Sequence, residues 1–161
     1  MKAATIHDLK HELNNKSVKE ISELCLRLSR YKKENKELLT YLLFEAENEV
    51  EYIQSVKQEI TEKFDEIPAY HGFYFKMKMI RKILRITKKH IRYSGIEATE
   101  VALLIHFCKS LNELGVKKTE SVALTNLYAS CVKKISSSIE KLHEDLQFDF
   151  REDIESLTAE M

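Results

Sequence analysis

Residues 67–96 read IPAYHGFYFKMKMIRKILRITKKHIRYSGI and contain no Asp or Glu. The proline near the start ends a preceding helix, and the glycine near the end suits a left-handed helix terminus. The pattern therefore predicts one helix over about residues 73–93. At the helical period, its isoleucines and leucines fall on one side and its cations on the other. The stretch predicts a helix that buries one side and presents a basic stripe on the other.

The basic stripe contains every Lys and Arg of this helix except Lys76. The cations nearest its centre are the candidate anion-binding residues, and they are Lys78, Lys82, Arg85, Lys89 and Arg92. A row of cations can neutralise successive phosphates, and the flanking aromatics Tyr74 and Tyr93 can stack on bases. One hypothesis is therefore nucleic-acid or polyanion binding through the basic helix 76–92.

The alternative interpretation is an internal match between opposite charges. Segments 44–66 and 140–161 each carry eight acids against two bases. Exposed ion pairs contribute only about 0–1 kcal/mol each, but in a bundle they would neutralise the stripe. We favour this internal match, in which either segment could lie beside the basic helix. Cover of Arg85 and Lys89 by residues 140–160 would remove the main support for polyanion binding.

Composition predicts an all-α fold. The 161 residues include only 3 Gly and 1 Pro, which are the residues that punctuate turn-rich β-folds. We expect seven to eight helices in antiparallel hairpins, forming a helical bundle or a short superhelical, solenoid-like stack. Hairpins over 18–47 and 97–142 echo each other weakly, as in a helical repeat. Residues 1–161 are expected to be a single domain whose two halves meet near 67–72.

Helix starts are predicted from capping residues. Ser17 and Glu20 have the spacing of a capping box, so a helix is expected to begin at residue 18. Asn35 is a predicted N-cap of the next helix, and Thr119 is a predicted N-cap of a helix over 120–142.

The segment 97–114 is apolar nearly all round, which predicts a central helix with Leu104 in the core. Periodic apolar residues between 146 and 157 predict one last, acidic helix. The aromatic turn around His71 contains Tyr70 and residues 73–75. We favour packing of this turn onto the core, and a binding surface is the alternative.

The formal net charge is +0, so any attraction to anions must be local. The scattered cysteines Cys25, Cys108 and Cys131 are expected to be buried and reduced, with burial raising their pKa. The N-terminal residues 1–16 lack an apolar signal region, and no segment approaches the length of a membrane span. We expect a cytoplasmic protein with no membrane partner.

No catalytic or metal site is predicted, and no cofactor. Glu140 and His143 have the spacing of one half of a di-iron site, but a second copy is missing. His106 and Cys108 are two residues apart, so on one helix they point in opposite directions. A hydrogen-bonded core histidine is the favoured interpretation of His106.

Three segments carry a resemblance to a known group of sequences. They are KKENKELLTYLLFEA at 32–46, KILRITKKHIRYSG at 82–95 and LHEDLQF at 142–148. Over about residues 17–150 the chain resembles an uncharacterised family of small all-helical bacterial cytoplasmic proteins. The resemblance implies a helical fold and a cytoplasmic location, and it brings no assigned activity.

Together these observations favour a non-enzymatic helical interaction or scaffold module with a protein partner. Nucleic acid is the alternative partner, bound through the basic helix. The sequence gives neither the oligomeric state nor the biological process.

Overall fold

The computed structural model describes residues 2–68, 70–116 and 121–159. Within these ranges the chain forms helices joined by short turns and contains no strand, which confirms the all-α class. The chain divides into two compact units, residues 1–44 and residues 45–161.

The first unit contains three short helices. They are α1 (Ile6–Asn14), α2 (Val18–Tyr31) and α3 (Lys33–Thr40), followed at the unit boundary by a π-helical turn, Tyr41–Glu45. The predicted capping box starts α2, because Ser17 accepts a hydrogen bond from the Glu20 N–H and Glu20 accepts one in return. None of α1, α2 and α3 has a buried residue, and α2 leaves several leucines exposed.

The prediction that Asn35 is the N-cap of the helix after α2 is wrong. Helix α3 begins at Lys33, with Lys32 at the N-cap and no side-chain hydrogen bond there. Asn35 lies inside the first turn instead, and its side-chain amide donates to the Leu28 carbonyl oxygen at 2.9 Å. This bond joins α3 to the end of α2, so the asparagine acts between helices and not at a cap.

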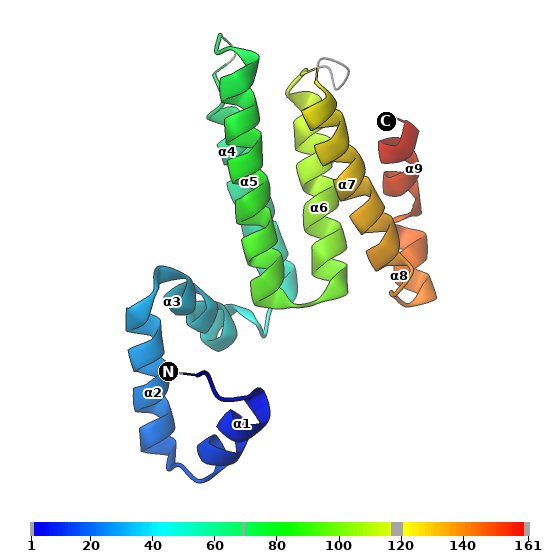
Figure 1. Ribbon diagram of the computed structural model, residues 1–161. Coiled ribbons are helices and arrows are strands. Elements are labelled where there is room, and N and C mark those ends of the chain that lie inside the picture. Colours follow the sequence, from blue (N-terminus) through cyan, green and yellow to red (C-terminus); the bar gives the residue numbers. More distant parts are fainter. Residues whose placement is uncertain (1, 69, 117–120, 160–161) are drawn as a thin grey trace. The chain divides into compact units, whose positions relative to one another are not determined.

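The second unit contains the six remaining helices. They are α4 (Glu49–Asp65), α5 (Phe73–Ser94), α6 (Glu97–Glu113), α7 (Val122–Ile139), α8 (Glu144–Asp149) and α9 (Arg151–Ala159). Helix α6 packs against α4, α5, α7 and α9, and Figure 1 shows it between α5 and α7. Leu104 on α6 is 1% exposed, which confirms the predicted central helix.

The ends of the helices in the second unit agree in part with the ends predicted from the sequence. Gly95 ends α5 with a φ of 69°, as predicted. Helix α7 begins at Val122 and is capped by Ser121; the predicted N-cap Thr119 and the predicted start at residue 120 lie outside the described residues. The last predicted helix is two helices, α8 and α9, which brings the described helices to nine instead of seven or eight.

The two compact units divide between Phe44 and Glu45. The segment 67–72, near which the two halves are predicted to meet, lies between α4 and α5 in the second unit. The expectation of a single domain over 1–161 stays a prediction, as does the helical repeat. No helix in the described part of the chain has the length and hydropathy needed to cross a membrane.

The cysteines are less uniform than predicted. Cys108 on α6 and Cys131 on α7 are buried, but Cys25 is half-buried. The pKa of Cys131 lies below its ordinary value, because a hydrogen bond with Cys108 stabilises its thiolate. Burial acts in the opposite direction, and the charge of Lys88 adds to the lowering. The predicted rise in pKa is therefore wrong for Cys131.

Candidate functional site

Helix α5 is amphipathic in the way the sequence predicts. Its buried side contains Met77, Ile80, Ile83 and Ile91. The opposite side exposes six cations, which we call the basic face: Lys78, Arg81, Lys82, Arg85, Lys88 and Arg92. Within the described residues, none of these six forms an ion pair with a carboxylate.

Lys89 differs from the other candidate residues. It is half-buried, and its Nζ lies 5.8 Å from the centre of the Tyr93 ring. Its charge also contributes to lowering the pKa of Glu59 on the neighbouring helix α4. The structure therefore exposes four of the five predicted anion-binding residues and turns Lys89 partly toward α4.

Two acids of α4 contact the C-terminal part of α5 or the residues that follow it. Glu59 lies 3.2 Å from His90 Nε2, and its hydrogen bond with His90 holds the pKa of Glu59 below its ordinary value. Glu49 accepts hydrogen bonds of 2.5 Å from Ser94 and Thr99. These contacts fix α4 against α5 and α6, and none of them involves a cation of the basic face.

Two acids of the C-terminal segment pair with cations outside the basic face. Asp153 on α9 lies 2.6 Å from Lys109 on α6, and Glu155 accepts a hydrogen bond from Arg151 on the same helix. Helix α9 packs on α6 and α7. Arg85 is exposed, and within the described residues no acid of the segment 140–161 pairs with it, so the internal match finds no support at this cation.

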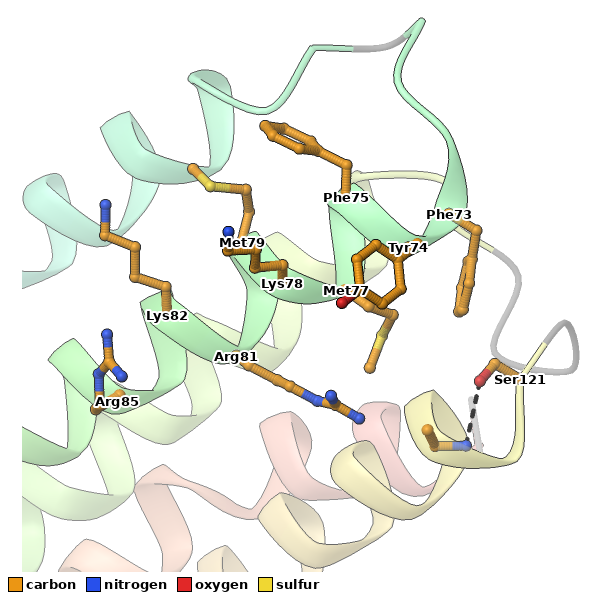
Figure 2. A pocket seen from close by; sticks show the side chains of 11 residues that line it. Phe73, Tyr74, Phe75, Met77, Lys78, Met79, Arg81, Lys82, Arg85 and Ser121 are labelled. Atoms are coloured by element: carbon orange, nitrogen blue, oxygen red, sulfur yellow. Dashed lines mark hydrogen bonds between the residues drawn. The ribbon is translucent and has the colours of Figure 1, made fainter.

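A groove of about 780 Å³ lies along the N-terminal half of α5. Figure 2 shows Lys78, Arg81, Lys82 and Arg85 among its lining residues, with Ser121 at the start of α7 on the far side. No Asp or Glu occurs among the described residues that line it. The described lining of the groove therefore has four cations and no acid, which favours a positive potential there.

Aromatic side chains form one end of this groove. Tyr74 is 86% exposed, and Phe73 beside it is half-buried. Tyr70 in the preceding turn is 85% exposed as well. The favoured prediction, that this aromatic turn packs onto the core, is therefore wrong for the two tyrosines. An exposed aromatic ring next to cations is a surface on which a planar ligand can stack.

The start of α7 completes the groove. Ser121 Oγ accepts a hydrogen bond of 3.2 Å from the Ala123 N–H, and both residues line the groove. The first turn of α7 contains no acid, so nothing in it offsets the positive end of the helix dipole. This end adds a partial positive charge to the cations across the groove.

Two contributors were absent from the predicted site residues. Arg81 lines the groove, and Ser121 faces it from a distant part of the sequence. The spacing of Tyr74, Lys78, Arg81 and Arg85, four or three residues apart, places them in one line along α5 and could have identified Arg81. No sequence signal places α7 beside this line.

Other polar groups have structural contacts. His106 bonds Thr61 Oγ1 at 2.9 Å, and burial lowers its pKa, followed by the charge of Lys57. Glu140 follows the end of α7 and His143 caps α8, so the two are not on one helix. Among the described residues, no cluster of three or more His, Cys, Asp or Glu could hold a metal ion.

A second, smaller cavity of about 370 Å³ lies where α5, α6 and α7 meet. Lys88 and Arg92 of the basic face line it, together with Lys134 and Glu100. Lys134 Nζ lies 3.0 Å from Glu100 Oε2, so this carboxylate is engaged by α7 and not by α5. The basic face therefore extends along α5 from the groove to this cavity.

No protein-family model, no curated protein and no solved structure matches this chain. The resemblance to a family of small helical bacterial proteins stays a prediction. The residues of the basic face and the groove are therefore the basis for proposing a function.

Proposed function

We propose that this protein is a non-enzymatic binding module that holds a nucleic acid on the basic face of α5. The observation that carries the proposal is the exposure of six cations on one helix face with no carboxylate partner in the described residues. Phosphates of a polyanion are the natural counter-charges for such a row, because each contact releases condensed counterions.

Repulsion between neighbouring cations of α5 in the isolated protein supports an external partner. Cations three or four residues apart, such as Lys78 with Lys82 and Arg81 with Arg85, repel each other. Each such pair destabilises a helix by about 0.2–0.5 kcal/mol, and no acid of α4 or α9 offsets the repulsion here. A bound row of phosphates would remove this repulsion.

The geometry of α5 suits contact with several phosphates at once. Lys78 and Arg92 are about 21 Å apart along the axis, at 1.5 Å per residue. The buried side of the helix packs on α4 and α6, so the cations project from a fixed support. A fixed row loses little conformational freedom on binding, which favours affinity.

The salt dependence of binding tests the proposal. We expect the protein to bind a fluorescent oligothymidylate of about 15 nucleotides, with an affinity that falls steeply between about 50 and 200 mM salt. If all six cations contact phosphates, the slope of log K against log salt should be about −4 for a single strand. Fluorescence anisotropy measures it. No binding at the lowest salt, or binding that is independent of salt, would contradict the proposal.

The protein partner favoured by the sequence stays a prediction. None of the contacts within the described residues bears on it.

A further inference from the structure

The groove at the N-terminal half of α5 has a property that phosphate binding alone does not explain. Tyr74 is 86% exposed, yet it lies on the same line of α5 as Lys78 and Arg81. A ring exposed to this extent contributes little to the stability of the fold, because little of its apolar area is removed from water. Its place in the row of cations indicates contact with the same ligand.

The chemistry of the groove fits a nucleotide whose base is unpaired. Aromatic side chains hold the bases of single strands by stacking, while neighbouring cations follow the backbone. In a duplex both faces of every internal base are covered by neighbouring bases, so a ring such as Tyr74 has no base face to contact. A row of cations alone would bind both forms, and the exposed ring adds a preference for the single strand.

The dimensions and charges of the groove are consistent with this ligand. Its volume of about 780 Å³ falls in the range of small-ligand sites, about 300–1,000 Å³. Figure 2 shows Arg81 extending from α5 on the side of Ser121, where the first turn of α7 begins. A phosphate between them would meet both the guanidinium group and the positive end of α7.

We propose that this groove holds an unpaired nucleotide of a single-stranded nucleic acid, with its base stacked on Tyr74 and a phosphate beside Arg81. The inference rests on the proposed function and names the form of nucleic acid that the basic face selects. The protein then binds single strands more tightly than duplexes of the same length.

The test compares Tyr74→Ala with Tyr74→Phe, which retains the ring. Binding of a fluorescent oligothymidylate of about 15 nucleotides is measured by anisotropy, beside its duplex with oligodeoxyadenylate. Tyr74→Ala should weaken single-strand binding about fivefold or more and leave duplex binding within about twofold. Tyr74→Phe should bind like the wild type. The matched control is Tyr31→Ala on α2, since Tyr31 is 78% exposed.

The outcomes separate the inference from the proposed function. Binding of both oligonucleotides that Tyr74→Ala leaves unchanged would overturn the inference and leave the proposed function standing. An equal loss for single strand and duplex would also overturn it, because stacking on an unpaired base cannot affect the duplex. No binding of either oligonucleotide by the wild type would overturn the proposed function, and the inference with it. A thermal melt by circular dichroism confirms that each variant is folded.

Discussion

Replacing Arg81 and Arg85 together by glutamate is expected to weaken oligonucleotide binding by about 100-fold or more. Each substitution removes a charged contact of about 1.5–3 kcal/mol and places a carboxylate near a phosphate. The helix itself should remain intact, since exposed substitutions usually change stability by less than about 0.5 kcal/mol. Fluorescence anisotropy gives the affinity, and a thermal melt gives the stability.

The matched control is Lys10→Glu with Lys19→Glu, which changes the net charge equally at exposed positions of the first unit. The control should bind nearly as well as the wild type. An equal loss in both double variants would show that only the overall charge matters. A lowered melting temperature in the α5 variant, without a change in binding, would instead support internal pairing of these arginines.

The substitution Leu104→Ala is expected to reduce the free energy of unfolding by about 2–5 kcal/mol. Leu104 lies on the central helix α6 and is 1% exposed. Its truncation loses the transfer free energy of the removed atoms and leaves a cavity that the surrounding helices only partly fill. Denaturant unfolding followed by circular dichroism measures the loss.

The matched control is Leu28→Ala on α2, where the leucine is 60% exposed. This change should alter the free energy of unfolding by less than about 0.5 kcal/mol. A loss below about 1 kcal/mol for Leu104→Ala would contradict the central position of α6.

The fold was predictable where one local signal dominates. The capping box of Ser17 and Glu20 and the left-handed Gly95 need no tertiary information, and both were confirmed. The prediction of Asn35 as an N-cap failed because its side chain bonds the end of the neighbouring helix α2 instead of its own helix terminus. The break between α8 and α9 was missed for a different reason. No glycine or proline marks it, and the apolar periodicity continues across it.

The candidate site was predictable only as far as one helix extends. Helical periodicity identified the basic side of α5, including Lys78, Lys82 and Arg85. It could not show that Lys89 is half-buried beside Glu59 of α4, because the neighbouring helix decides how far a residue at the edge of the basic side is covered. The groove itself needs α7 beside α5, and no local pattern encodes that arrangement.

Lysine footprinting tests the central claim most directly, because it locates the bound oligonucleotide on the surface. The folded protein is acetylated with and without oligothymidylate, and mass spectrometry reports the modification of each lysine. We predict that Lys78, Lys82 and Lys88 become protected, while the exposed Lys10 and Lys19 are modified equally in both samples. Protection at Lys10 and Lys19 with none at the three α5 lysines would contradict the account.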